Sequence, residues 1–298
     1  MFRTVRASSA VIALGCVIAG TVVAGCDEDE ADNWDPLASD KAQAATFTGT
    51  KKIKVDGHQI NVSCSGKTQK KKPIIMLMPG HGDGLTKMAG IQKTLSKDNR
   101  VCSYDRLGEG ASDKPDSIQS YEDSGKILTG VLKKLAGDRH VVLAGHSMGG
   151  AVAARYAPEH QDQVKGLVLI DATSPSAVAD TTKQIPKSAK GLAGQVRLQV
   201  VQINKGVNKE KLKATDSEVP DAGDMPVEVM KHGKKYLSAV PKFGPTLEHI
   251  WTKGQREWLK LSGNSHYTVA KTSTHYIYVD QPALTVKKIQ AITDKAAK

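Results

Sequence analysis

The fold of this 298-residue chain is decided by residues 141–150, which read Val-Val-Leu-Ala-Gly-His-Ser-Met-Gly-Gly. The apolar start predicts a buried strand, and the glycines around Ser147 predict a tight turn into a helix. Such a turn lifts the serine hydroxyl above the sheet edge and brings backbone N–H groups of the helix start beside it. Because a serine is a weak nucleophile alone, we expect a histidine to take its proton and a carboxylate to orient that histidine.

Working outward from this turn, apolar strands alternate with helices. Strands that are apolar throughout and separated by helices predict a parallel sheet covered on both faces. The pattern breaks after residue 170 and resumes with a strand at 225–230, so we interpret residues 176–224 as a lid inserted into one domain spanning 49–298. The remaining predicted strands are 53–55, 58–64, 73–78, 100–104, 164–170 and 267–270, and the predicted helices are 85–97, 120–135, 247–261 and 282–292.

The composition narrows the possible partners. Lys+Arg number 42 against 31 Asp+Glu, which gives a formal charge of +11, but the lysines are scattered and lack interleaved aromatic residues that could stack on bases. We therefore predict a solvated basic surface and no nucleic-acid partner. The chain has no His-Glu-x-x-His and no Cys-x-x-Cys, so we predict neither a metal nor another cofactor.

The N-terminus has the features of an export signal. Arg3 and Arg6 precede a short apolar run, residues 10–24, which ends in Val-Ala-Gly-Cys at 23–26. This ending resembles the lipobox of bacterial lipoproteins, and the resemblance implies cleavage of a signal peptide, residues 1–25, and acylation of Cys26. An ordinary signal peptide with a coincidental cysteine is the alternative. The lipoprotein interpretation predicts an exported, extracytoplasmic protein held at the membrane through its lipid, with residues 26–48 as a flexible tether.

Export also bears on the cysteines. Cys16 would leave with the signal peptide and Cys26 would carry lipid, so Cys64 and Cys102 remain. An oxidising compartment favours a disulfide between them. Each lies in a predicted strand, and a bridge requires that the two strands be neighbours in the sheet.

Four segments together resemble the α/β-hydrolase family, from about Lys51 to the C-terminus. They are the serine turn, Met-Pro-Gly-His-Gly at 78–82, the run from Tyr104 to Asp113, and Ser-Thr-His-Tyr at 273–276 ahead of Asp-Gln-Pro at 280–282. The resemblance implies a mostly parallel eight-stranded sheet with helices on both faces and a lid after strand 6. The sheet order of this family places the second strand beside the fourth, which favours the Cys64–Cys102 bridge.

The resemblance also assigns the histidine. His275 follows the last strand and precedes the last helix, which is the position from which the family takes its base. His266 precedes that strand and would lie at the opposite sheet edge, and His146 lies inside the serine turn, so we expect neither to act as the base.

The carboxylate is assigned by elimination. In most of the family it follows the seventh strand, but residues 231–236 contain no acid. Asp171 ends the sixth strand, a location that some family members use instead, so we predict that it orients His275. Its alternative role is to cap the following turn. The reserve acids are Glu248, Asp221 and Asp224.

Two backbone donors are expected to bind the oxyanion. One is the N–H of Met148, directly after the serine, and the other is the N–H of His81, in the turn after the third strand. Asp105 and Arg106 match a family segment that we interpret as bracing the loops under the site.

Together these features predict a lipid-anchored serine hydrolase that forms an acyl-serine and cleaves a carboxylic ester in a small-molecule acyl substrate. Ser147 argues against the haloalkane dehalogenases and epoxide hydrolases of this fold, which have an aspartate at that position. The alternatives are a peptidase or amidase, an acyltransferase, or a surface lipoprotein that kept the fold as an inactive binding module.

Overall fold

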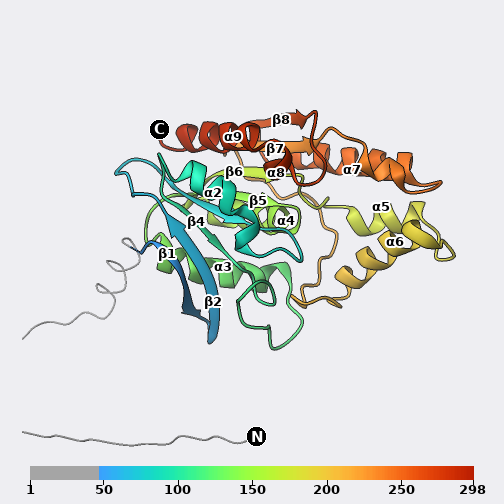
Figure 1. The fold of residues 1–298 in the computed structure, drawn as a ribbon, viewed down its shortest axis with the longest axis horizontal. Coiled ribbons are helices and arrows are strands. Elements are labelled where there is room, and N and C mark those ends of the chain that lie inside the picture. The colour runs from blue at the N-terminus through green and yellow to red at the C-terminus, as the bar shows by residue number, and fades with distance from the viewer. Residues whose placement is uncertain (1–46) are drawn as a thin grey trace, which may run out of the picture. The chain divides into compact units, whose positions relative to one another are not determined.

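The computed structural model of the protein describes residues 47–298. Within these residues, eight strands form one sheet in the order β1-β2-β4-β3-β5-β6-β7-β8 (Figure 1). Strands β3 to β8 pair in parallel, whereas β1 and β2 are antiparallel to their neighbours. The strands are β1 (Gly49–Val55), β2 (His58–Ser65), β3 (Ile74–Met78), β4 (Val101–Tyr104), β5 (Val141–His146), β6 (Val164–Ile170), β7 (Val227–His232) and β8 (Ser265–Ala270). The predicted signal peptide, Cys26 and nearly all of the predicted tether lie outside the described residues.

Helices cover both faces of this sheet. Alternate residues of a strand point to opposite faces, so Met76 of β3 packs in one apolar core with α3 and α4, whereas Ile75 and Leu77 pack in another with α2 and α9. The α-helices are α2 (Ala89–Leu95), α3 (Tyr121–Leu135), α4 (Met148–Tyr156), α5 (Ala177–Gln184), α6 (Gly191–Asn204), α7 (Gly244–Glu257), α8 (Ile277–Asp280) and α9 (Pro282–Lys295). The predicted fold class is confirmed. No helix among residues 47–298 is long and apolar enough to cross a membrane.

Helix α3 illustrates how the local sequence fixes these elements. Ser120 caps its N-terminus: the hydroxyl accepts from the backbone of Asp123, whose carboxylate accepts from the backbone of Ser120. Apolar residues at helical spacing, including Leu128, Val131 and Leu132, are fully buried against the sheet.

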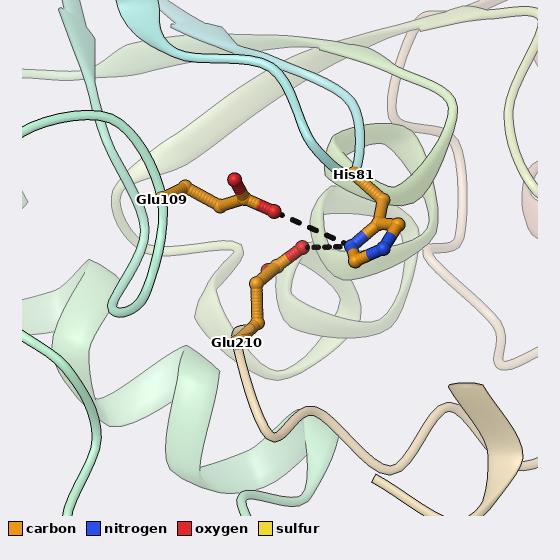
Figure 2. A group of neighbouring side chains, drawn as sticks. All are labelled: His81, Glu109 and Glu210. Carbon is orange, nitrogen blue, oxygen red and sulfur yellow. Dashed lines mark hydrogen bonds and ion pairs between the residues drawn. The ribbon is translucent and has the colours of Figure 1, made fainter. Parts of the chain in front are cut away.

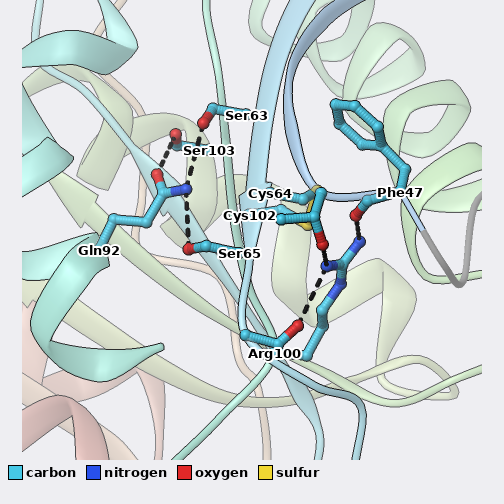
Figure 3. The surroundings of a disulfide bond; sticks show 10 residues. Phe47, Ser63, Cys64, Ser65, Gln92, Arg100, Cys102 and Ser103 are labelled. Carbon is cyan, nitrogen blue, oxygen red and sulfur yellow. Dashed lines mark hydrogen bonds between the residues drawn. A yellow bond between two sulfur atoms is a disulfide. The ribbon is translucent and has the colours of Figure 1, made fainter. Parts of the chain in front are cut away.

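The predicted disulfide joins the two strands that the fold places side by side. Cys64 of β2 lies directly opposite Cys102 of β4, with 4.1 Å between their Cα atoms, and the two sulfurs are bonded. Figure 3 shows the supporting contacts: Arg100 donates to the carbonyls of Gly66 and Phe47, and Gln92 of α2 bonds serines of both strands. This corner therefore holds β2, at the antiparallel side of the sheet, to β4.

The segment between β6 and β7 carries α5 and α6, which extend from the sheet beside α7 (Figure 1). A small separate core holds them there, formed by Ile185 and Ala193 of the segment and by Val240 and Leu247 from the region of α7. Helices α5 and α6 therefore share a core with the region of α7, whereas later residues of the segment, such as Leu212 and Ala222, join the main core of the sheet.

Strand β7 corrects one predicted boundary. It runs two residues beyond the predicted end at Met230, because β8 continues the ladder and pairs Lys231 with Val269 and His232 with Ala270. His232 is therefore the last residue of a buried strand and does not begin a loop.

Candidate active site

Ser147 lies in the turn between β5 and α4. Its backbone has φ +49° and ψ −117°, a conformation that L-residues rarely adopt. Small neighbours make the turn possible, since a Cβ on Gly145 would lie 2.5 Å from the Gly149 carbonyl oxygen, and one on Gly149 would lie 2.3 Å from that of Met78. The turn therefore holds the serine at the carboxyl end of the parallel strands, as the sequence pattern predicts.

Asp171 directly follows β6 and is fully buried. Its Oδ2 lies 2.8 Å from Nδ1 of His275, in the loop between β8 and α8. Its Oδ1 accepts hydrogen bonds from Nε1 of Trp251 at 2.9 Å and from the backbone N–H of His232 at 3.1 Å. Burial alone would raise the pKa of Asp171, but the hydrogen bonds from His232 and His275 hold it well below its usual range. The acid is thus ionised and fixed beside the histidine.

Ser147 and His275 line one cavity of about 400 Å³. Both side chains are half-buried, and within the described residues no hydrogen bond joins the serine hydroxyl to His275. Ser147 and His275 thus border the same cavity, and Nδ1 of His275 faces Asp171.

The two other histidines considered for the base have different surroundings. Burial, together with the neighbouring His275, lowers the pKa of His146 to about 3, and its Nε2 lies 3.1 Å from the backbone oxygen of His275. A neutral His146 therefore supports the loop of His275. His266 is exposed in β8, pairs in register with Glu228 near the start of β7, and lies 2.8 Å from Nζ of Lys295.

The reserve acids do not approach His275. Glu248 of α7 bonds to Nε2 of His232 at 3.0 Å. Asp221 and Asp224 precede β7, so they lie toward the amino end of the parallel strands, where Asp221 accepts a hydrogen bond from the nearby Gly223.

The turn after β3 packs against the serine. A Cβ on Gly80 would lie 3.3 Å from that of Ser147 and 2.8 Å from Nδ1 of His146. Within the described residues, no hydrogen bond is made by the backbone N–H of His81 or by that of Met148. Two backbone donors beside the serine are thus free to bind an oxyanion.

The side chain of His81 belongs to a buried ionic cluster, shown in Figure 2. Its Nδ1 lies 2.8 Å from a carboxylate oxygen of Glu210, in the lid segment, and 3.3 Å from one of Glu109. Hydrogen bonds to these two glutamates raise the pKa of His81 to about 9, so it is charged at neutral pH. Arg106 binds Glu210 through Nε at 2.7 Å and Nη2 at 3.0 Å, and it also donates to the carbonyl of Gly80. Arg106 therefore holds the turn after β3 in place.

The same cluster is the one group of described residues whose donor atoms come close enough for a metal ion, since ligand atoms of His81, Glu109 and Glu210 lie within 4.8 Å of one another. One oxygen of Glu109 and both oxygens of Glu210 already accept hydrogen bonds, however. Arg106 binds both oxygens of Glu210, and the N–H of Gly82 donates to Glu109 at 2.7 Å. The arrangement is that of a hydrogen-bonded ion cluster in which His81 and Arg106 supply the positive charge.

Side chains from the lid segment and from α7 form much of the rest of the cavity. Val196, Val200 and Ile203 of α6 line it together with Leu247 and Ile250 of α7, and the polar Asp180, Thr181 and Gln199 also reach it. These α6 residues recur at helical spacing, and Leu198 lies outside this lining with 54% of its surface exposed. Beside the serine, the cavity therefore offers an apolar volume of moderate size.

Sequence reasoning missed His232 and Trp251, both of which contact Asp171. One sequence signal could have pointed to His232, because it lies near the strand end where the family most often places its acid. Trp251 comes from the middle of α7, and no sequence pattern places it near Asp171.

Comparison with known proteins supports the fold. Residues 73–216 match the family model described as alpha/beta hydrolase fold. An uncharacterised protein of Mycobacterium tuberculosis is 35% identical over 103 residues, which cover 34% of this chain and 29% of that protein, so the chain spans under a third of this curated relative.

Solved structures align over more of the chain. A bacterial membrane phospholipase A has a TM-score of 0.59 at 18% identity, covering 88% of this chain and 91% of that one. An enol-lactonase from Burkholderia xenovorans also has a TM-score of 0.59 at 18% identity, covering 81% and 99%. Together with the sheet order and the match over residues 73–216, these similarities show that the chain has the α/β-hydrolase fold.

Proposed function

We propose that the protein is a serine hydrolase that cleaves carboxylic esters through an acyl-serine. The observation that carries this proposal is that Ser147, in its strained turn, shares one cavity with a histidine bound to a buried, ionised aspartate. This is the set of groups that acyl transfer requires: a nucleophile, a base and an orienting carboxylate.

In the proposed reaction, Oγ of Ser147 attacks the ester carbonyl while Nε2 of His275 takes the hydroxyl proton. The N–H groups of Met148 and His81 bind the oxyanion that forms. His275 then gives its proton to the departing alcohol, and water, activated by the same histidine, releases the acid. Asp171 keeps the Nδ1–H tautomer of His275 and stabilises its charge.

The cavity indicates which part of the substrate lies where. Its valine, leucine and isoleucine side chains suit an apolar acyl or alcohol group, and Asp180 of α5 and Gln199 of α6 add a polar part to the lining. The charged His81, in the turn after β3, also lines the cavity and is paired with Glu210. We infer a small apolar ester as the substrate class.

Fluorophosphonate labelling of residues 27–298 tests the proposal, since the reagent reacts where a serine is activated and an oxyanion site is formed. We expect one adduct, located on Ser147 by mass spectrometry, and none in Ser147→Ala. His275→Ala should label far more slowly, whereas His266→Ala should label as the wild type does. Folded protein that takes up no reagent would contradict the proposal and favour a binding module.

We further propose that Cys26 carries the lipid that anchors the protein outside the cytoplasm. The test is metabolic labelling with a fatty-acid analogue in a bacterial host that processes lipoproteins. Cys26→Ser should lose the label and accumulate uncleaved precursor, whereas the matched Cys16→Ser variant should keep the label. Label retained in Cys26→Ser would contradict the anchor.

A further inference from the structure

Asp171 has a second histidine partner besides His275. Fully buried at the end of β7, His232 has its Nδ1 3.0 Å and 2.8 Å from the two carboxylate oxygens of Asp171. Its Nε2 lies 3.0 Å from Oε2 of Glu248 on α7. The four side chains form a chain in the order Glu248–His232–Asp171–His275, which begins under α7 and ends at the cavity.

The protonation of this chain follows from its donors and acceptors. A neutral imidazole has one N–H and one lone pair, so it could donate to only one of the two carboxylates. One oxygen of each acid already accepts from a fixed donor, since Trp251 donates to Oδ1 of Asp171 and the backbone N–H of Leu237 donates to Oε1 of Glu248 at 2.9 Å, which favours the ionised form of both acids. A doubly protonated His232 satisfies both acids. Burial opposes this charge, but the bonds to Asp171 and Glu248 raise the pKa of His232.

The charges in the chain nearly compensate each other. Two carboxylates and one imidazolium leave a single negative charge, which is what a lone aspartate would carry. The positive member lies nearer to the proposed base than Glu248 does, since His232 and His275 both reach Oδ2 of Asp171 at 2.8 Å, whereas Glu248 binds the other nitrogen of the His232 ring. His232 and His275 therefore hold the Asp171 carboxylate between them.

Two other titratable groups contact His232 but do not compete with it for the two acids. Lys231, the preceding residue of β7, donates to the backbone oxygen of His232. The ring of Tyr236 packs against the edge of the His232 ring, with 4.9 Å between centroids. Within the described residues, neither Lys231 nor Tyr236 makes an ion pair with Asp171 or Glu248.

We propose that His232 and Glu248 are positioning residues for the Asp171–His275 pair: Glu248 holds the second nitrogen of the His232 ring, and His232 fixes the carboxylate of Asp171 toward His275. This inference rests on the proposed function for its catalytic meaning. A carboxylate fixed in this way keeps the proton of His275 on Nδ1, which leaves Nε2 able to accept the serine proton.

The test compares His232→Asn, which keeps an N–H donor near Asp171 but removes the charge, with His232→Asn/Glu248→Gln, which removes both charges. His249→Asn, at an exposed neighbour of Glu248 on the same helix, is the matched control. The protonation of the His232 ring and the tautomer of the His275 ring are followed by NMR, which needs no turnover. The pH dependence of fluorophosphonate labelling is measured in parallel.

We expect both His232 variants to lose part of the Nδ1–H tautomer of His275 and to label about tenfold more slowly, because the carboxylate of Asp171 is no longer fixed from its second side. His249→Asn should leave both unchanged. In the wild type, both ring nitrogens of His232 should carry a proton at pH 7.

An unchanged His275 tautomer and labelling rate in folded His232→Asn, or a His232 ring with a single proton at pH 7, would overturn the proposal. If His232→Asn does not fold, Glu248→Gln decides, since His232 must then lose its second proton at a lower pH than in the wild type. A doubly protonated His232 without any labelling would support the charged chain while contradicting the hydrolase.

Discussion

Asp171→Asn should disable the proposed base through its tautomer. In the native chain, Oδ1 of Asp171 accepts from two groups that can only donate, the indole N–H of Trp251 and the backbone N–H of His232. Oδ2 faces Nδ1 of His275 and of His232, which can give up a proton. An asparagine will therefore direct its oxygen to the first pair and its NH₂ to the histidines. His275 then has to accept at Nδ1, so Nε2 carries the proton and cannot take one from Ser147.

The magnitude follows from the loss of the productive tautomer and of the carboxylate charge. Removal of the orienting acid from such a site lowers kcat by about 10⁴, so we expect kcat/KM for a p-nitrophenyl ester to fall by about 10³ to 10⁴. That loss corresponds to about 4–5.5 kcal/mol of transition-state stabilisation. Circular dichroism should confirm folding, and Asp224→Asn, at an exposed acid, should retain full activity.

A folded Asp171→Asn variant within tenfold of the wild-type rate would refute this reasoning. It would mean that another acid orients the base. Glu248→Gln would then be expected to lose more of its kcat/KM than Asp171→Asn does, because Glu248 is the next carboxylate in the series of buried contacts.

Four further predictions concern the frame around the site. Cys64→Ala/Cys102→Ala should lower the free energy of unfolding in urea by about 4 kcal/mol, from the 38-residue separation that the disulfide closes, and a loss under about 1 kcal/mol would count against the bond. Gly149→Ala should abolish labelling because its Cβ would meet the backbone oxygens of Met78 and Pro79. The control Gly90→Ala, where the Cβ has no neighbour within 4 Å, should leave labelling intact. Equal labelling of the two variants would be inconsistent with the turn described. The raised pKa of His81 adds to the free energy of unfolding; this contribution is complete below its ordinary pKa of 6.5 and is lost as the pH rises through about 9. The free energy of unfolding of Glu210→Gln should therefore fall less between pH 6 and pH 10 than that of the wild type. An equal fall would exclude this role. Val200→Phe should lower the rate for longer acyl chains relative to acetyl, unlike Leu198→Phe at the exposed face, and a preference shared by both variants would place the acyl group elsewhere.

The architecture could be predicted from sequence because its signals are local. Apolar strands such as residues 164–170 lie between helices, and the glycines around Ser147 are required by close backbone contacts within a few residues. The pairing of β2 with β4 is not local. It was expected from the family's sheet order, and the Cys64–Cys102 bond agrees with it.

The surroundings of Asp171 could not be predicted because they depend on register. Pairing of Ile170 with Met230 places the end of β6 beside the end of β7, and this alone brings His232 to Asp171. Helices α5 and α6 were also missed as elements. They are weakly amphipathic or short and rest on a small core shared with α7, so their stability depends on residues far away in the sequence.

Two consecutive stretches of the lid segment make different contacts, which matters for engineering. Helix α6, residues 191–204, lines the cavity, whereas residues 205–214 supply Glu210 and pair Leu212 with Gln119. Because the two stretches are consecutive, the sequence of α6 can be replaced while residues 205–214 are kept. Replacements that end before Lys205 should change the acyl preference and leave the turn after β3 intact. Replacements that extend through Glu210 would also remove the carboxylate that binds His81 and Arg106.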